Sequence, residues 1–340
     1  MTKLPDWNQK LARFRKSDLK RSIFELAVTA GALAGLWGLG WVAWSAGFWW
    51  AALLLTIPAA FFLVRMFMIQ HDCGHGSFFE EKAANEWVGR AIGVLTLTPY
   101  DYWRRTHAMH HATSGNLDRR GLGVIEMLTV DEYLALPRIK RLGYRLYRNP
   151  FVMFGLGPAF VFFLQQRIPI GLMKEGWRPW VSTLGNGVFA LAGLAVLIAL
   201  VGWTPILVVN AVTLLIAATI GVWLFYVQHQ FEGVRWSRNG SWKRDEAALH
   251  GSSHYDLPGP LPWLTAHIGI HHVHHLSSRI PFYRLPDVLA AHPELRDVSR
   301  VGLLESFKCV RLALWDEAAQ RLVSFREIRD RPRTPMAVAA

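Results

Sequence analysis

The chain has 340 residues, of which 52% are hydrophobic, 13% aromatic and 18% charged, and its formal net charge is +12. The apolar content is high for a soluble domain and the charged fraction is too high for a protein buried wholly in lipid, so membrane spans are expected to alternate with a polar part. The basic residues flank apolar runs, as in Arg138-Ile-Lys140-Arg141, which indicates contact with anionic lipid headgroups and argues against nucleic-acid binding.

Two long apolar runs near the start of the chain predict a transmembrane hairpin. They cover about residues 23–44 and 48–70 and are separated by a Ser-Ala-Gly break. Each can cross about 30 Å of hydrocarbon at about 1.5 Å per residue, and the first is too long for a signal peptide. The seven Lys and Arg from Lys3 to Arg21 predict a cytoplasmic N-terminus. Arg65 is expected to reach the headgroups from the end of the second run.

The rest of the chain alternates polar segments with a second apolar pair. Residues 71–150 are mixed and polar and are expected in the cytoplasm. Residues 151–164 are apolar but short, which favours an interfacial helix over a span. A second hairpin is predicted at about 183–203 and 205–228, and residues 229–325 are again expected in the cytoplasm.

These segments predict one all-α integral membrane domain over residues 1–340. Four transmembrane helices form two hairpins, and the two polar segments form a cytosolic helical cap. Because an even number of spans returns the chain to its starting side, both termini and the cap are expected in the cytoplasm, as in a multi-pass protein of a bacterial inner membrane. Two cysteines without a CxxC motif, Cys73 and Cys309, suit this reducing compartment.

Most of the fourteen histidines fall in three tight clusters on the predicted cytoplasmic side. In an α-helix, residues at i, i+3 and i+4 project from one face with Cβ atoms about 5–6 Å apart. One cluster therefore offers a pair of imidazoles and each of the others a face of three. The clusters are His71-Asp-Cys-Gly-His75, His107-Ala-Met-His110-His111 and His271-His272-Val-His274-His275.

Eight imidazoles on these faces exceed the needs of one metal ion, since a single zinc takes four ligands. The economical interpretation is a dimetal site, to which a histidine at the end of the last apolar run could add a ninth nitrogen. The candidate metal ligands are His71, His75, His107, His110, His111, His229, His271, His274 and His275.

Other residues near the clusters are given different roles. His272 points away from the face that its neighbours share, and His267 is a candidate to support a ligand. His250, His254 and His292 are interpreted as surface histidines. The acceptors that would orient the ligands are sought among Asp72, Asp118, Glu232 and Asp256. The basic turn Trp103-Arg104-Arg105 either meets a substrate headgroup or is simply solvated.

Ligand type alone does not identify the metal, because imidazole suits zinc, copper, iron and nickel. A dimetal centre at the mouth of apolar helices favours an apolar substrate. Oxidation of an unactivated C–H bond requires an oxygen-activating metal, and zinc has no redox chemistry. Two iron ions with O2 as co-substrate are therefore the favoured interpretation.

The clusters and their flanks resemble the membrane fatty acid desaturase family, in particular its bacterial and plant omega-6 or delta-12-like branch. The family pattern is H-x(3–4)-H followed by two copies of H-x(2–3)-H-H, and the three clusters match it in order. The flanking sequences HDCGHGSFF at residues 71–79 and HHVHHLSSRIPFY at residues 271–283 also resemble this branch. The likeness extends over roughly residues 22–286, and the three motifs together are highly specific.

The resemblance implies four transmembrane helices under a cytosolic cap, a non-haem di-iron site, and an extra ligand at the position of His229. His267 departs from the pattern, because many relatives carry Asn there. The chain holds no His-Pro-Gly-Gly haem motif, so electrons are expected from a separate donor such as a ferredoxin or a cytochrome b5-like protein. Such donors are commonly acidic, and a basic cytoplasmic face would attract them.

The favoured activity is O2-dependent desaturation, which removes two hydrogens from a long acyl chain carried by a lipid or a thioester. The depth of the substrate in its tunnel would set the position of the double bond. A di-iron hydroxylase or ketolase acting on an alkane, sterol or carotenoid stays open as an alternative, and it would add oxygen to its product. A membrane zinc protein used for sensing or hydrolysis is a third possibility, which metal analysis would distinguish.

Overall fold

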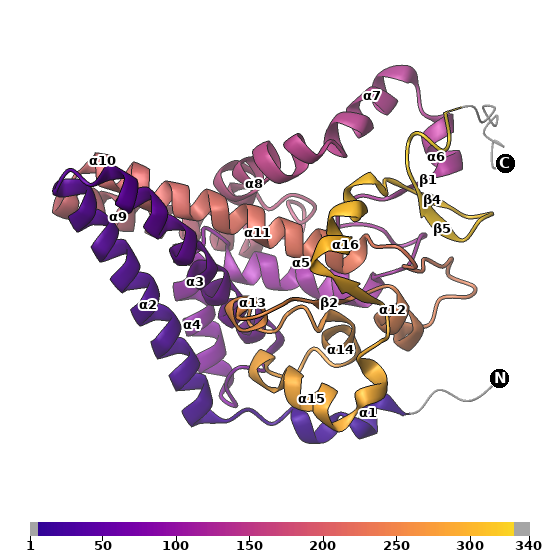
Figure 1. The fold of residues 1–340 in the computed structure, drawn as a ribbon, viewed down its shortest axis with the longest axis horizontal. Helices are drawn as coiled ribbons and strands as arrows, with labels where there is room; N and C mark the ends of the chain where they lie inside the picture. The colour runs from indigo at the N-terminus through magenta and orange to yellow at the C-terminus, as the bar shows by residue number, and fades with distance from the viewer. Residues whose placement is uncertain (1–5, 330–340) are drawn as a thin grey trace.

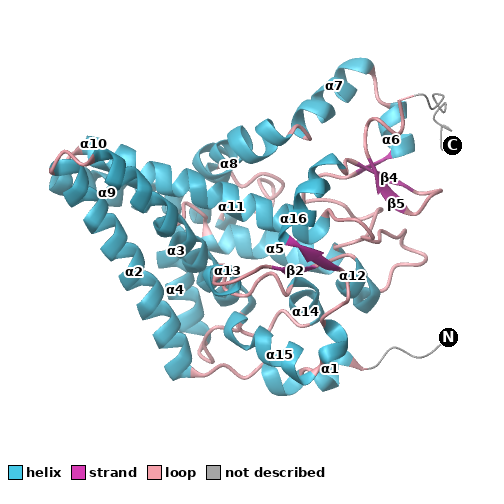
Figure 2. Cartoon of the chain, viewed as in Figure 1, coloured by secondary structure: helices cyan, strands magenta, loops and turns pink. Residues whose placement is uncertain are grey.

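The computed structural model describes residues 6–329, which are mainly helical (Figures 1 and 2). Four helical segments are long and apolar enough to cross a membrane, so the two predicted hairpins are confirmed. The segments are α2 (Leu19–Ser45), α3 (Trp49–His75), α9 (Arg178–Val201) and Trp203–His229, which joins α10 (Trp203–Pro205), a π-helical stretch (Ile206–Ala211) and α11 (Val212–His229).

Each span is longer than the apolar segment that predicted it, and the difference matters most in α3. This helix continues five residues past the predicted end at residue 70. His71 and His75 therefore lie within the last turns of a membrane helix. α3 ends where Gly76 adopts the left-handed conformation (φ 64°), a backbone state that glycine enters without strain.

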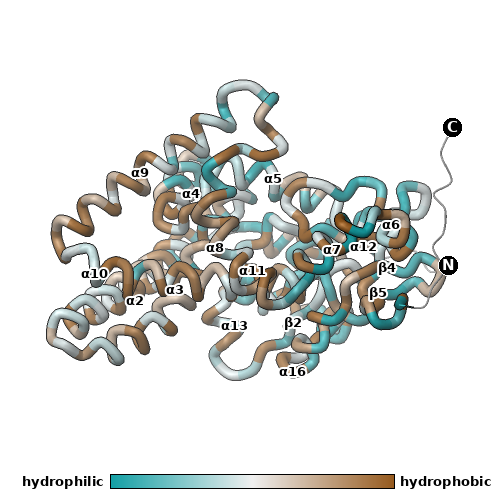
Figure 3. Tube along the Cα trace, turned by 90° about the horizontal axis from the view of Figure 1, so that it is seen from above, coloured by the Kyte–Doolittle hydropathy of each residue, from teal (hydrophilic) through white to brown (hydrophobic). Residues whose placement is uncertain are grey.

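α3 is the central span, and the other spans present their outer faces to the surroundings. It packs against α2, α11 and α4, and it is the most buried of the four, whereas α9 is the most exposed. Figure 3 shows hydrophobic residues along much of the spans, whereas the cap mixes hydrophilic and hydrophobic segments. The hairpins are joined across their contact by the indole of Trp41, which donates to the side chain of Asn210 at 2.8 Å.

Arg65 is fully buried, so the expectation that it reaches the headgroups is wrong. Its guanidinium pairs with the carboxylate of Glu25 in α2 and donates to the carbonyl of Trp263. Its central carbon also lies 4.0 Å from the centre of the Trp263 ring. A buried guanidinium needs such partners because desolvation is costly. Here they fasten the first hairpin to the short helix α13 (Leu261–Leu264), which precedes the third histidine cluster.

The cap is built from short helices, and α4 and α5 pack against the spans. The remaining helices are α1 (Trp7–Lys10), α4 (Lys82–Leu95), α5 (Tyr100–Thr113), α6 (Val130–Ala135), α7 (Arg138–Tyr147), α8 (Gly157–Ala159), α12 (Arg244–His250), α13 (Leu261–Leu264), α14 (His271–Leu276), α15 (Leu285–Ala291) and α16 (Leu303–Ser306). α8 lies between π-helical turns at Val152–Leu156 and Phe160–Leu164, so the short apolar stretch is helical as predicted.

Short strands tie remote parts of the cap together. β4 (Leu314–Asp316) pairs in parallel with β1 (Leu128–Thr129) and antiparallel with β5 (Arg321–Val323). β2 (His254–Asp256) pairs in parallel with β3 (Arg300–Gly302), with His254 opposite Arg300. The sequence did not predict these strands, because two or three residues are too few to show an alternating pattern.

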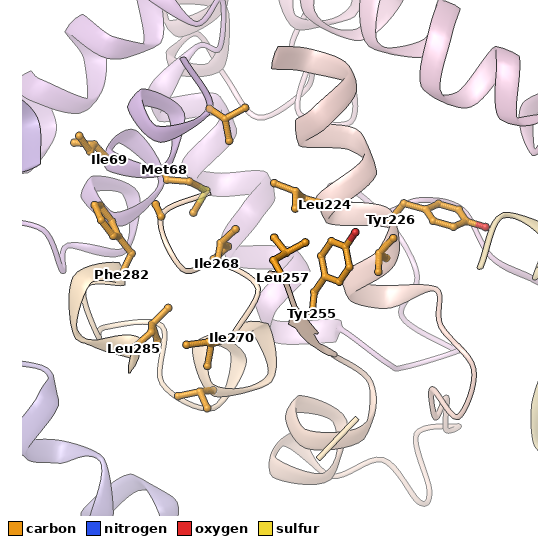
Figure 4. Close-up of a cluster of buried hydrophobic side chains, with 14 of the residues drawn as sticks. Met68, Ile69, Leu224, Tyr226, Tyr255, Leu257, Ile268, Ile270, Phe282 and Leu285 are labelled. Carbon is orange, nitrogen blue, oxygen red and sulfur yellow. The ribbon is translucent and has the colours of Figure 1, made fainter. Parts of the chain in front are cut away.

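A hydrophobic core joins the ends of the spans to the cap. In Figure 4, Met68 and Ile69 of α3 and Leu224 of α11 lie near Ile268 and Phe282, which flank the third histidine cluster. These side chains are all buried. Because apolar burial is the main stabilising term in folding, this core holds the segments that carry histidines in a common position.

Candidate metal centre

Four helices deliver the histidines to one place. α3 and α11 bring His71, His75 and His229 from the spans, while α5 and α14 bring the other clusters from the cap. All nine predicted ligands converge in the interior and form two groups, in each of which the candidate ligand atoms lie within 4.8 Å of one another. The groups are His71, His75, His107, His111 and His274, and His110, His229, His271 and His275.

Each cluster of three is divided between the groups. His107 and His111 stay together while His110 faces the other group, and His274 is likewise separated from His271 and His275. Residues four apart on a helix are closer in direction than residues three apart, so each i, i+4 pair serves one group. The sequence predicted a shared face but not this division.

Ring nitrogens within the groups lie close enough to share an ion. The Nε2 atoms of His107 and His111 are 3.1 Å apart, as are those of His229 and His271. This is about the spacing of adjacent ligand nitrogens around an ion with metal–nitrogen distances of roughly 2.1 Å. Both nitrogens of His110 are buried without a hydrogen-bond partner among the described residues. The donor set therefore fits a pair of metal ions.

The second ring nitrogens of two histidines are oriented by oxygen atoms. Oδ1 of Asp72 lies 3.0 Å from Nδ1 of His71, so Asp72 is confirmed as an acceptor, and its Oδ2 accepts from the backbone N–H of Phe282. The carbonyl of Gly251 lies 3.1 Å from Nδ1 of His229. Such contacts leave Nε2 free to bind a metal. Sequence reasoning missed Gly251, because a backbone carbonyl leaves no signature in a motif.

The other predicted acceptors are directed elsewhere. The carboxylate of Asp118 binds Arg238 and the backbone N–H of Asn239, and Asp256 binds Arg300, so both predictions are wrong. Glu232 is exposed. No hydrogen bond joins it to a candidate ligand within residues 6–329.

The histidines of the cap are held in their neutral form. Burial lowers the pKa of the imidazoles of α5 and α14 well below the usual value, and neighbouring histidines lower the pKa further. Protonation of one ring would place a charge in a desolvated space beside other rings. Neutral imidazole is the form that binds metal, so the electrostatics of the site match its ligand set.

The remaining histidines lie outside both groups. His272 is buried, and its Nε2 lies 2.9 Å from the carbonyl of Leu295, which confirms that it points away from its neighbours. His267 has a left-handed φ of 53° and is half-buried. His254 is buried against His272, so its interpretation as a surface histidine is wrong. His250 and His292 are only partly exposed.

Trp103 covers one side of the centre. Its indole stacks on the ring of His107 at 4.5 Å between centroids and lies 5.7 Å from His71. A Cβ placed on Gly74 would lie 2.9 Å from this indole, so glycine is needed for the close approach of α3 and α5. Arg105 pairs with Glu175 at 2.9 Å. Trp103 therefore belongs to the wall of the site rather than to a solvated turn.

A cleft of ≈ 1170 Å³ lies between α4, α5 and α9. Its apolar walls include Val94, Val181 and Phe189. Gly74 and Ala108, which are chain neighbours of His75 and His107, also line it. Arginines stand among its lining residues, namely Arg90, Arg104, Arg105 and Arg178. The cleft thus combines apolar walls with charged groups, which include Asp101 as well as the arginines.

Comparisons with known proteins agree with this geometry. The family model described as fatty acid desaturase matches residues 48–302. A fatty acid desaturase of Bacillus subtilis is 44% identical over 326 residues, which cover 95% of this chain and 91% of that protein. Two proteins of Synechocystis are each 26% identical, an sn-1 oleoyl-lipid 12-desaturase (79% of this chain, 74% of that protein) and an sn-1 acyl-lipid omega-3 desaturase (ferredoxin) (78% and 73%).

Proposed function

The chain belongs to the fatty acid desaturase family, and from this premise we propose that it introduces a cis double bond into a long acyl chain at a di-iron centre. The protein is an integral membrane oxidoreductase. The observation that carries the proposal is the convergence of nine histidines from four helices into two groups, in which all but His75 and His111 are buried. We assign these histidines as the iron ligands, five in one group and four in the other.

Iron suits this site better than zinc on chemical grounds. Imidazole binds both metals, but removal of hydrogen from an unactivated methylene requires a redox-active metal. When bound, two irons would supply the reduction of O2 and the oxidation of the acyl chain. The protein's own part is to hold neutral imidazoles in place, with Asp72 orienting His71 and the carbonyl of Gly251 orienting His229. The burial of the histidines limits the access of water, which would otherwise compete in the reaction.

We assign the cleft between α4, α5 and α9 as the entry for the acyl substrate. Its apolar walls suit a hydrocarbon chain. Of its arginines, Arg90, Arg104 and Arg105 already pair with carboxylates, so Arg178 is the one that suits an anionic headgroup. Relatives named as acyl-lipid desaturases favour an intact lipid over a thioester as the acyl carrier. One of these relatives carries ferredoxin in its name, which favours a separate, acidic electron donor for this chain as well.

The proposed orientation places the cap, both termini and the metal centre in the cytoplasm. In Figure 1 the turn between α2 and α3 and the turn between α9 and α10 lie together at the end of the molecule away from the cap, so the other ends of the spans face the cap. The seven cations from Lys3 to Arg21 favour the cytoplasm for that side. A cytoplasmic electron donor would then meet the face nearest the histidines.

The test is expression of the full chain in a bacterial host that lacks polyunsaturated lipids, followed by location of double bonds in its fatty acids by mass spectrometry. We expect a product that has lost two hydrogens and purified protein that carries about two irons. The variants His110→Ala and His274→Ala should abolish the product while the protein still inserts. His250→Ala, on the partly exposed end of α12, is the matched control and should keep activity.

Two results would contradict the proposal. One is an active protein that contains zinc without iron, and the other is retained product formation in both ligand variants. A hydroxylated product would keep the metal site but replace the desaturase assignment by that of a hydroxylase. Iron content is measured in the same preparations, so loss of metal is distinguished from loss of substrate binding.

A further inference from the structure

α7 (Arg138–Tyr147) has an unusual combination of charge and exposed apolar surface. Its sequence is RIKRLGYRLY, and the whole stretch from Pro137 to Pro150 has no acidic residue. Ile139, Leu142 and Leu146 recur at the spacing of one helical face, and they are 74%, 53% and 54% exposed. An apolar face of this kind is not a feature of a helix that contacts only water.

The exposed face cannot turn toward the protein, because the opposite side of α7 is already fixed. The Tyr144 hydroxyl donates to the carbonyl of Ala313 at 2.9 Å and accepts from the backbone N–H of Leu128. Just beyond the helix, the buried guanidinium of Arg148 donates to Tyr226 and to the carbonyl of Leu312. These contacts lock the rotation of α7 about its own axis.

Three cations of α7 have no anionic partner. Arg138, Lys140 and Arg141 form no ion pair with any residue between 6 and 329, although the ion pairs of that part of the chain include many other arginines. Basic side chains beside an exposed apolar face are the pattern of a helix that lies in a membrane interface and binds anionic headgroups. A soluble anion would leave the apolar face unexplained.

The apolar face is continuous with the surface of the spans. Beyond α7 the exposed side chains continue as Phe151 (86%), Leu156 (70%) and Phe160 (55%). This stretch is attached to α11 by the hydroxyl of Thr219, which donates to the carbonyl of Phe154 at 2.9 Å. In Figure 1, α7 continues the line of α8 and crosses the direction of α2 instead of running alongside it.

We propose that α7 lies in the bilayer interface on the side of the cap, with Ile139, Leu142 and Leu146 in the acyl region and the three free cations on anionic phospholipid headgroups. α7 is then a lipid-binding element rather than a part of the water-facing cap. The inference rests on the surface of the helix and on the membrane location of the protein, and it does not depend on the metal or on the reaction.

The test places a spin label on the full-length protein in nanodiscs of phosphatidylcholine, with and without one quarter phosphatidylglycerol. Leu142→Cys labels the apolar face, and Asp131→Cys, on the exposed side of α6, is the matched control. Both native cysteines are buried, so the unsubstituted protein reports the background labelling. Collision with O2, which concentrates in lipid, is compared with collision with a water-soluble nickel chelate.

The expected result is a several-fold higher ratio of O2 to nickel collisions at residue 142 than at residue 131. The anionic lipid should raise this ratio further, and the triple variant Arg138→Gln, Lys140→Gln and Arg141→Gln should remove that gain. Equal nickel access at both positions would overturn the proposal. Shielding of residue 142 from both reagents would indicate a protein partner and would also overturn it. The same holds if the ratio of O2 to nickel collisions is unchanged by the anionic lipid.

Discussion

A single carboxylate, that of Asp72, joins the first histidine cluster to the segment after the third. It lies 3.0 Å from Nδ1 of His71 and accepts the backbone N–H of Phe282 at 2.6 Å. The same carboxylate therefore orients His71, its neighbour in sequence, and binds Phe282, which is 210 positions away. This arrangement lets the cap influence the direction in which His71 presents its Nε2.

We expect Asp72→Asn to lower the affinity for iron by about 10–100-fold, the usual effect of losing a group that orients a ligand. The amide keeps the size of the carboxylate. It has only one acceptor oxygen, so it cannot accept hydrogen bonds from both the imidazole of His71 and the backbone N–H of Phe282. Iron content of protein purified at limiting iron is the measurement. Asp118→Asn, which alters a carboxylate bound to Arg238, is the control and should retain full iron; equal iron in both variants would contradict the assigned role of Asp72.

Among the helices, the contact of α2 with α3 contains the buried pair of Glu25 and Arg65, with side-chain exposures of 1% and 0%. Removal of one partner leaves a buried charge without compensation, which costs roughly 3–5 kcal/mol. We therefore expect Glu25→Gln to lower the thermal stability of the protein in detergent strongly. The double variant Glu25→Met with Arg65→Met should recover most of the loss, and a double variant less stable than Glu25→Gln would contradict this account.

The assignment of the cleft as the substrate entry can be tested on α9, where Gly185 is one of the lining residues and a Cβ at this position meets nothing within 4 Å. Gly185→Leu would fill the space without displacing protein atoms. We expect it to reduce desaturation of long acyl chains at least about tenfold, with unchanged iron content. Gly38→Leu in α2 is the matched control, because its Cβ also meets nothing. Full activity of Gly185→Leu would exclude this cleft as the entry.

On the scale of the molecule, the proposed metal centre would cross-link both hairpins and the cap. α3, α5, α11 and α14 contribute all nine histidines, so a bound ion stabilises the folded chain by its affinity for that state. We expect an iron chelator to lower the thermal unfolding temperature of the wild-type protein. The His110→Ala variant should unfold at the same temperature with and without chelator, and an equal shift in both proteins would place the chelated metal elsewhere.

The sequence alone determined the features that depend on short separations along the chain. Apolar runs of sufficient length predicted the four spans, because a helix must satisfy its own backbone hydrogen bonds in lipid. Histidines at i, i+3 and i+4 predicted common faces, because helical geometry places them there. The motif HDCGH also placed Asp72 beside a candidate ligand.

Only the tertiary structure decided how these local faces combine. The division of the nine histidines into two groups, the burial of Arg65 and the contact of Gly251 with His229 all depend on segments that are remote in sequence. Asp118 and Asp256 show the same limit, since arginines brought in from other segments bind them instead. The reason is physical: desolvation makes each buried polar group take the partner that packing places beside it, and the identity of that partner is not encoded in the group's own neighbourhood.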